Sequence, residues 1–190
     1  MYMAKKNTHK KVDSKGFTVW FTGLACSGKS TIADKLVPIL SKKGFKVERL
    51  DGDVVRQSLT KDLGFSVEDR RKNIERVSFV AKLLTRNDVA VLATFISPEI
   101  LMRDNARKEI GNFIEVHVKA SVDACAKRDV KGMYKKAFAG QIKDFTGVHA
   151  SAPYEEPPNP ELVVDTEKLS IDQCVAKVIE TLAALGYVET

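Results

Sequence analysis

The stretch Gly23-Leu24-Ala25-Cys26-Ser27-Gly28-Lys29-Ser30 decides the fold, because it matches the pattern G-x-x-x-x-G-K-[ST] at all four fixed positions. In this pattern, successive backbone N–H groups of a glycine-rich loop converge on a phosphate at the start of a helix. The lysine reaches the β- and γ-phosphates of a nucleotide, and the last hydroxyl ligates magnesium. The sequence therefore predicts a site for ATP and Mg²⁺, with Lys29 as a catalytic group and Ser30 as a metal ligand.

The residues on either side of this loop fit the same interpretation. Residues 17–22 are aromatic and β-branched, which is typical of a buried strand. After the loop, apolar residues recur at helical spacing, at Ile32, Leu36, Ile39 and Leu40. A chance glycine turn before an ordinary helix is the alternative, but it leaves this order of strand, loop and helix unexplained. We expect ATP to contact the whole loop together with Thr31.

Short apolar stretches alternate with helical patterns along the chain, which indicates an α/β fold. The predicted architecture is a five-stranded parallel sheet with helices on both faces, the fold of a P-loop kinase. Strands are predicted near residues 17–22, 46–50, 89–96, 112–118 and 161–165. Helices are predicted to begin after Ser66, Ser97 and Ser170, with Pro98 in a first helical position, and to end at Gly44, Gly111 and Gly186. A length of 190 residues suits one domain, over residues 17–190.

Charge and composition narrow the functional classes. The formal net charge is +6, but residues 1–16 carry five lysines against Asp13 and so hold +4 of it. This basic segment is predicted to be a disordered leader, with weak polyanion binding as the alternative. It lacks the apolar core of a secretory signal, and no run of about 18 apolar residues could span a membrane. A soluble cytoplasmic protein is expected, without nucleic-acid or membrane partners.

The three cysteines are odd in number and far apart, which fits neither a disulfide framework nor closely spaced metal ligands. Cys125 and Cys174 are predicted to be small buried apolar residues. Cys26 lies in the phosphate loop at a helix N-terminus, and accidental oxidation is favoured there over a designed redox role.

Residues 128–160 depart from the alternation of strands and helices. They are rich in cations and contain three glycines and four prolines. A long segment of this kind in a compact domain favours a mobile lid, whose cations would screen phosphate charge. A disordered insertion is the alternative.

Two further groups of residues carry candidate chemistry. Asp51-Gly52-Asp53 directly follows the second strand, and ligands bind at the carboxyl ends of strands in open parallel sheets. Asp53 can hold magnesium-bound water or accept a proton from a hydroxyl, although a turn with a helix cap is the alternative. Arg70 and Asn73 lie three residues apart on one helix face, which suits a small anionic group, whereas a solvated basic helix start is the plainer interpretation.

Several motifs, taken together and in order, resemble the adenylylsulfate kinase family. They are Asp51-Gly52-Asp53, Leu63-Gly64-Phe65-Ser66 with Asp69-Arg70 and Asn73, Phe95-Ile96-Ser97-Pro98, the segment 128–137, the segment 142–147, and Pro153-Tyr154-Glu155. The resemblance covers nearly everything from residue 17 onward. It implies transfer of the ATP γ-phosphoryl group to the 3′-hydroxyl of adenosine 5′-phosphosulfate, the second step of sulfate activation, giving 3′-phosphoadenylyl sulfate and ADP. It also implies a homodimer, and it leaves open a functional coupling to a sulfate adenylyltransferase.

The same resemblance implies the acceptor site. Phe65 and Phe145 would sandwich the adenine, because stacking favours two flat aromatic faces. Asp53 would orient the 3′-hydroxyl or a magnesium-bound water, and Lys131 with Arg128 would close over the transferring phosphoryl group. The implied substrate-binding positions are Asp53, Arg56, Phe65, Arg70, Asn73, Ile96, Ser97, Lys131, Lys143, Asp144 and Phe145, of which Arg56, Arg70 and Asn73 would hold the phosphosulfate anions.

Ser97 has two roles open to it. It is either a helix N-cap that contacts the substrate or a phosphoryl acceptor, and direct in-line transfer needs no covalent intermediate. Three positions depart from the family pattern: Glu99 stands where tyrosine is usual, Phe138 replaces an arginine, and Asp144 replaces a glycine. These changes concern lid electrostatics and affinity more than the type of reaction.

Competing functions remain at this point. A nucleoside monophosphate, gluconate or shikimate kinase would share the phosphate loop, the sheet and a lid. A GTP-dependent switch normally needs an Asn-Lys-x-Asp signature, which the chain lacks, and the D-x-x-G pattern at residues 144–147 comes too late in the sequence.

Overall fold

The computed structural model describes residues 16–189, so most of the predicted basic leader lies outside the described residues. Five parallel strands form one sheet in this part of the chain, in the order β2-β3-β1-β4-β5. Their bounds are β1 (Phe17–Thr22), β2 (Lys46–Asp51), β3 (Val89–Thr94), β4 (Phe113–Lys119) and β5 (Leu162–Asp165). The predicted strands are confirmed, with boundaries that differ by at most two residues.

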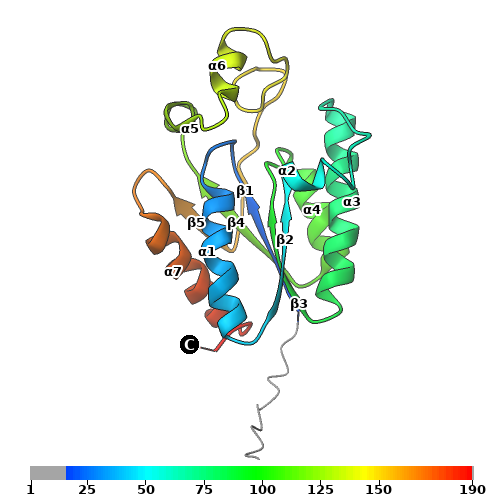
Figure 1. Ribbon diagram of the computed structural model, residues 1–190, viewed down its shortest axis with the longest axis vertical. Helices are drawn as coiled ribbons and strands as arrows, with labels where there is room; N and C mark the ends of the chain where they lie inside the picture. The colour runs from blue at the N-terminus through cyan, green and yellow to red at the C-terminus, as the bar shows by residue number, and fades with distance from the viewer. Residues whose placement is uncertain (1–15, 190) are drawn as a thin grey trace, which may run out of the picture.

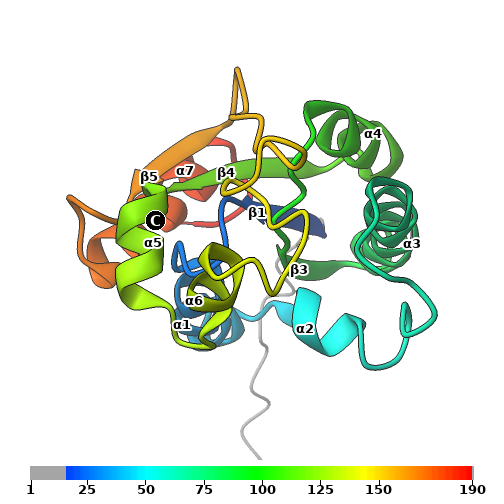
Figure 2. The same cartoon turned by 90° about the horizontal axis from the view of Figure 1, so that it is seen from above.

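Helices cover both faces of the sheet, as predicted. Side chains of α1 (Lys29–Lys42) and α7 (Ile171–Ala184) share one apolar cluster with Phe17, Val19 and Phe21 of β1. Side chains of α3 (Val67–Thr85) and α4 (Ile100–Ile110) pack on the opposite face, around Trp20. Figure 2 shows the two helix pairs on either side of the sheet. Because β1 is buried on both faces, its sequence is apolar almost throughout.

Three shorter helices complete the described chain, namely α2 (Gly52–Val55), α5 (Val122–Arg128) and α6 (Met133–Phe138). All three lie at the end of the molecule where the strands have their carboxyl ends (Figure 1). Since β1 pairs with β3 on one side and β4 on the other, the chain leaves β1 at the switch point of the sheet. Ligands bind at such crevices in open α/β sheets.

The predicted helix ends are mostly confirmed. Ser66 and Ser170 cap α3 and α7 through their hydroxyl groups, and Gly44, Gly111 and Gly186 follow helices with φ values of 91°, 84° and 78°. The predicted start at Ser97-Pro98 is wrong, because α4 begins at Ile100 after Glu99. The Ser97 side chain is turned into the protein instead, and a carboxylate oxygen of Glu155 accepts a hydrogen bond from the Ile100 N–H at 2.6 Å.

The segment 128–160, called the lid segment below, has more structure than a plain loop. It contains α6 and contributes Tyr134, Ala137 and Phe145 to a small apolar cluster with Leu24 and Cys125. The Tyr134 hydroxyl also donates to the Ala25 carbonyl at 3.0 Å. The lid segment therefore packs directly on the phosphate loop, while its mobility stays a prediction.

Two smaller expectations concern the cysteines and membranes. Cys125 and Cys174 are buried and unpaired, as predicted, whereas Cys26 is half-buried in the phosphate loop. No helix within residues 16–189 has both the length and the apolar character that crossing a membrane requires.

Candidate active site

The phosphate loop links β1 to α1 and needs glycine at two positions. Gly23 has a φ of 146°, and a Cβ atom there would lie 2.4 Å from the Val118 carbonyl oxygen. Gly28 has a φ of 107° and forms the N-cap of α1 without a side-chain hydrogen bond. The first N–H groups of a helix have no intrahelical partner, so a loop that wraps this terminus offers donors to a phosphate.

Lys29, the first residue of α1, is folded back over this loop. Its Nζ donates to the Gly23 carbonyl at 2.9 Å and to the Leu24 carbonyl at 2.6 Å, and it lies 3.5 Å from the Ser27 hydroxyl. The side chain is 8% exposed, and burial lowers the Lys29 pKa to about 8, opposed by the neighbouring acidic groups. An ammonium group held by neutral carbonyls in a buried loop gains strongly from an anion, because Coulomb attraction is stronger away from water.

Ser30 faces Asp51, the last residue of β2. The Ser30 hydroxyl donates to Asp51 Oδ2 at 2.7 Å, and Thr94 donates to the same oxygen at 2.8 Å. Thr94 is the register partner of Asp51 in β3, which explains the second contact. Burial alone would raise the Asp51 pKa, but the Ser30 and Thr94 hydrogen bonds hold it below its ordinary value. Asp51 is therefore ionised at neutral pH, next to the predicted magnesium ligand.

The structure brings Asp51, rather than Asp53, to Ser30. Asp53, in α2, forms an ion pair with Lys131 of the lid segment. The two carboxylates are two residues apart in the motif, so the sequence pattern did not reveal which one faces the phosphate loop. The register of β2 against β3 is the signal that separates them, because it places Asp51 opposite Thr94 at the end of the sheet.

Two guanidinium groups lie beside Phe65 and hydrogen-bond to neutral partners. Arg56 lies 4.4 Å from the centre of the Phe65 ring and donates to the Gly64 carbonyl at 3.0 Å. Arg70 donates to the carbonyls of Phe65 and Asp144, at 2.8 and 2.6 Å, and to the Thr146 hydroxyl. Within residues 16–189 neither guanidinium group forms a salt bridge.

The electrostatics of these two arginines favour an anion. Burial lowers the pKa of both groups, and the nearby Arg56 charge lowers the Arg70 pKa further. The charges of Asp69 and Asp53 near Arg56, and of Asp144 and Glu99 near Arg70, offset part of this cost. Because the hydrogen-bond partners of both groups are neutral, a bound anion would still stabilise these partly buried cations. A guanidinium fork fits the oxygen atoms of a phosphate or sulfate. The plainer interpretation, a solvated basic helix start, does not explain why Arg70 reaches across to the lid segment.

The two predicted stacking residues lie in different environments. Phe65 is 64% exposed, whereas Phe145 is 8% exposed and packs edge-on against Tyr134 with ring centres 4.9 Å apart. Phe145 therefore belongs to the apolar cluster of the lid segment, called the lid cluster below, whereas Phe65 is open to a ligand. Stacking of both rings on the adenine stays a prediction. Asn73 is also buried, and its Oδ1 accepts from the Thr60 hydroxyl at 2.8 Å. Thr60, which the sequence patterns did not single out, orients this amide.

Ile96 and Ser97 follow β3, and hydrogen bonds with residues of β1 hold both of them in place. The Thr22 hydroxyl donates to the Ile96 carbonyl at 2.7 Å. The Ser97 hydroxyl accepts from Trp20 Nε1 at 3.1 Å and lies 3.2 Å from the Thr22 hydroxyl. Ser97 is 2% exposed, so its hydroxyl forms hydrogen bonds inside the protein and does not cap a helix.

Two of the three departures from the family pattern, at Asp144 and Glu99, have local explanations, and nothing in the structure explains the third, at Phe138. Asp144 has a φ of 53°, a left-handed conformation in which glycine is at ease and aspartate is tolerated, and its side chain accepts from Ser151. Glu99 forms an ion pair with Arg71 at 2.7 Å. Phe138 is 60% exposed, and Lys143 is exposed on the lid segment.

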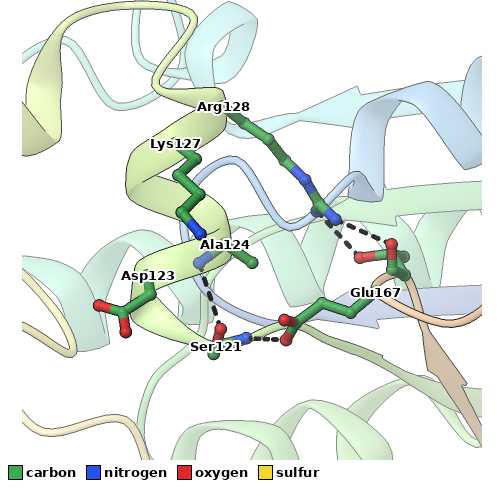
Figure 3. Close-up of a pocket in the computed structure, with 7 residues that line it drawn as sticks. Ser121, Asp123, Ala124, Lys127, Arg128 and Glu167 are labelled. Carbon is green, nitrogen blue, oxygen red and sulfur yellow. Dashed lines mark hydrogen bonds between the residues drawn. The ribbon is translucent and has the colours of Figure 1, made fainter.

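A pocket of about 560 Å³ lies beside the phosphate loop. Arg128 projects across it in Figure 3, and its guanidinium group donates to the Thr166 carbonyl at 2.8 Å and to the Ser27 carbonyl at 3.3 Å. Arg128 thus contacts the backbone of the phosphate loop, while its closure with Lys131 over the phosphoryl group stays a prediction. The pocket is lined by Ser121, Asp123, Ala124, Lys127, Arg128, Thr166 and Glu167.

Known proteins resemble this chain over nearly its whole length. The family model for adenylylsulphate kinase matches residues 15–165. A probable adenylyl-sulfate kinase of Pseudomonas aeruginosa is 58% identical over 88% of this chain and 78% of its own length. An adenylyl-sulfate kinase of Halothermothrix orenii is 54% identical over 93% of this chain and 94% of its own. Among solved structures, the Mycobacterium tuberculosis APS kinase in complex with AMPPNP and APS matches with a TM-score of 0.85 and 43% identity, over 89% of this chain and 98% of that one.

Proposed function

The chain belongs to the adenylylsulfate kinase family, and on that premise we propose that it transfers the γ-phosphoryl group of ATP to the 3′-hydroxyl of adenosine 5′-phosphosulfate. The products are ADP and 3′-phosphoadenylyl sulfate, as in the second step of sulfate activation. The observation that carries the proposal is the pair Arg56 and Arg70. These cations form no salt bridge within residues 16–189 and lie with Phe65 at the same end of the sheet as the phosphate loop.

ATP is the phosphoryl donor, and its phosphates bind along Gly23–Ser30 and Thr31. Lys29 exchanges the carbonyls of its own loop for the β- and γ-phosphate oxygens. The pocket beside Arg128 and Thr166 adjoins this loop, and its size suits the nucleoside part of ATP. We propose that the Arg128 guanidinium group stacks on the base there, since guanidinium planes pack well on aromatic rings.

Magnesium fits the oxygen donors at Ser30 and Asp51. Mg²⁺ prefers hard oxygen ligands, and it commonly binds through one or two protein groups together with nucleotide phosphates and water. The Ser30 hydroxyl and the ionised Asp51 carboxylate lie 2.7 Å apart and provide such a set. When bound, the ion would neutralise charge on the phosphate oxygens.

The acceptor side uses the groups near α2 and α3. Arg56 and Arg70 bind the phosphosulfate oxygens, with Asn73 held in place by Thr60, while Phe65 stacks on the adenine. Asp53 orients the 3′-hydroxyl, and Lys131 moves from Asp53 to the transferring phosphoryl group when both substrates are bound. Direct in-line transfer needs no acceptor on the protein, and the buried Ser97 hydroxyl suits a positioning role.

The proposed stacking of Phe65 on the adenine can be tested by comparing two alanine variants. Phe65→Ala is expected to raise the KM for adenosine 5′-phosphosulfate by about 5- to 150-fold, because base stacking is worth roughly 1–3 kcal/mol. Phe79→Ala is the control, since Phe79 is similarly exposed at 55% but lies on α3 away from the arginine pair. Initial-rate kinetics at saturating ATP measure both values. Equal KM values for the two variants would remove Phe65 from the acceptor site.

An acceptor panel tests the function as a whole. ADP release is measured with ATP and Mg²⁺ in the presence of adenosine 5′-phosphosulfate, AMP, gluconate or shikimate. Rapid turnover is expected with adenosine 5′-phosphosulfate and with none of the other three acceptors. Turnover of another acceptor, with none of adenosine 5′-phosphosulfate, contradicts the proposal.

Assembly, location and domain organisation are proposals of the same kind. We expect a homodimer, which light scattering on the purified protein checks, and a cytoplasmic location. One kinase domain over residues 17–190, with residues 128–160 as its lid, agrees with the single sheet and the packing of the lid segment on the phosphate loop. Coupling to a sulfate adenylyltransferase is testable by measuring the combined rate of the two enzymes.

A further inference from the structure

A buried cluster of ion pairs lies next to the backbone of Ser97, a residue of the proposed acceptor site. Its centre is Arg103 on α4, which is 2% exposed and is among the largest fully buried side chains of residues 16–189. Arg103 Nε lies 2.8 Å from Glu115 Oε1, at the middle of β4. Arg107, one helical turn further along α4, lies 3.3 Å from the other oxygen of Glu115 and also pairs with Glu161.

Arg103 uses the rest of its guanidinium group on two backbone carbonyls. Nη1 donates to the Ser97 carbonyl at 2.5 Å, and Nη2 donates to the Glu155 carbonyl at 2.7 Å. Ser97 belongs to the loop after β3, whereas Glu155 belongs to the lid segment. One buried side chain therefore ties β4, the Ser97 loop and the end of the lid segment together.

The Ser97 loop, residues 95–99 between β3 and α4, has a backbone conformation that needs stabilising contacts. Ser97 has a φ of 39°, in the left-handed region that costs energy for a residue with a Cβ atom. Such conformations persist when the surroundings over-determine them. Here the side chain is fixed by Trp20 and Thr22, and the carbonyl is fixed by Arg103.

The end of the lid segment is fastened to the same loop. The Glu155 N–H donates to the Pro98 carbonyl at 2.9 Å, and its carboxylate accepts from the Ile100 N–H. The Tyr154 hydroxyl lies 2.9 Å from the Thr22 hydroxyl, and the Tyr154 ring lies 5.7 Å from the Arg103 guanidinium. These contacts join Tyr154 and Glu155, called the root of the lid below, to the backbone that carries Ile96 and Ser97.

We propose that Arg103 is a positioning residue for the acceptor: anchored on Glu115, it holds the Ser97 backbone and the root of the lid in the arrangement that binds adenosine 5′-phosphosulfate. The role of the loop rests on the proposed function. Arg103 touches no substrate and acts through Ile96, Ser97 and Tyr154. Its loss displaces the acceptor and leaves the phosphate loop, which is carried by β1 and α1, in place.

The test compares Arg103→Lys with Arg107→Lys. Both variants keep a positive charge next to Glu115, but only Arg103→Lys loses the two-carbonyl bridge, because an ammonium group lacks the planar guanidinium fork. For Arg103→Lys, kcat/KM for adenosine 5′-phosphosulfate is expected to fall by about 10- to 100-fold, since small misplacements in a positioned site cost this much. The KM for ATP is expected to stay within about twofold. Arg107→Lys is expected to leave both values near those of the unaltered chain.

Tryptophan fluorescence gives a readout that does not depend on turnover. The chain has one tryptophan, and Trp20 is fully buried with its indole N–H on the Ser97 hydroxyl. Loosening of the Ser97 loop is expected to shift the Trp20 emission to longer wavelength and to increase its quenching by acrylamide in Arg103→Lys. Arg107→Lys is expected to show neither change.

The outcomes separate the inference from the proposed function. If the unaltered chain does not phosphorylate adenosine 5′-phosphosulfate, the proposed function fails, and fluorescence still decides the role of Arg103. If the two lysine variants behave alike in kinetics and quenching, the positioning role is wrong. Should Arg103→Lys not fold, Arg103→Gln is the second variant, because its shorter side chain cannot span Glu115 and the carbonyls of Ser97 and Glu155. Unchanged acceptor KM and quenching in that variant overturn the inference.

Discussion

Replacing Lys29 with alanine is expected to lower kcat by about 10²- to 10³-fold, the usual loss when one pre-organised group that stabilises transition-state charge is removed. Lys29 is the buried cation of the phosphate loop, and its Nζ lies within 3.5 Å of three loop oxygens. Negative charge on the transferring phosphoryl group and on the leaving oxygen has to be compensated there, and positioning with electrostatic stabilisation supplies most of the catalysis in phosphoryl transfer.

The fold is expected to survive this replacement. Burial lowers the Lys29 pKa to about 8, so the folded chain holds this charge less favourably than the unfolded chain does. Alanine removes that cost, and the thermal midpoint is therefore expected to stay the same or rise. The measurements are ADP release under saturating substrates and thermal unfolding followed by circular dichroism.

Lys35→Ala is the matched control on the same helix. Lys35 is half-exposed on α1 and pairs with Asp172 of α7, an exposed contact of little energetic weight. Its kcat is expected to equal that of the unaltered chain. Near-normal turnover by Lys29→Ala, or an equal loss in both variants, would show that the loop does not hold the transferring phosphate as proposed.

Asp51→Asn and Asp53→Asn are expected to fail in different ways. Asp51 lies 2.7 Å from the Ser30 hydroxyl, so its amide variant is expected to lower kcat by on the order of 10²-fold and to raise the Mg²⁺ concentration needed for half-maximal rate. Asp53 pairs with Lys131 on the acceptor side. Its amide variant is expected to lower kcat with little change in the Mg²⁺ requirement.

Mg²⁺ titrations of the initial rate, at fixed saturating ATP and acceptor, distinguish the two carboxylates. The two variants serve as controls for each other, because each removes one negative charge from the same three-residue motif. A shifted Mg²⁺ requirement in Asp53→Asn, with none in Asp51→Asn, would assign the metal to Asp53, as first predicted from the sequence.

Local sequence patterns predicted most of the fold because each pattern has its own short-range cause. The apolar run of β1, the hydroxyl caps at Ser66 and Ser170, and the glycines at helix ends depend on neighbouring residues, and all of them are confirmed. The failure at Ser97-Pro98 has the opposite origin. A serine before proline suits a helix start, but hydrogen bonds to Trp20 and Thr22, more than 70 residues away, hold this serine elsewhere.

The candidate site shows the same difference between short-range and long-range causes. The sequence by itself determined the phosphate loop, the α/β fold and the family, because a glycine loop between a strand and a helix works through its own backbone and its residues are contiguous. The tertiary structure alone decided that Asp51 faces Ser30, that Phe145 is buried in the lid cluster, and that Arg103 joins β4, the Ser97 loop and the lid segment. These relations depend on strand register and on packing between distant segments, which no local pattern encodes.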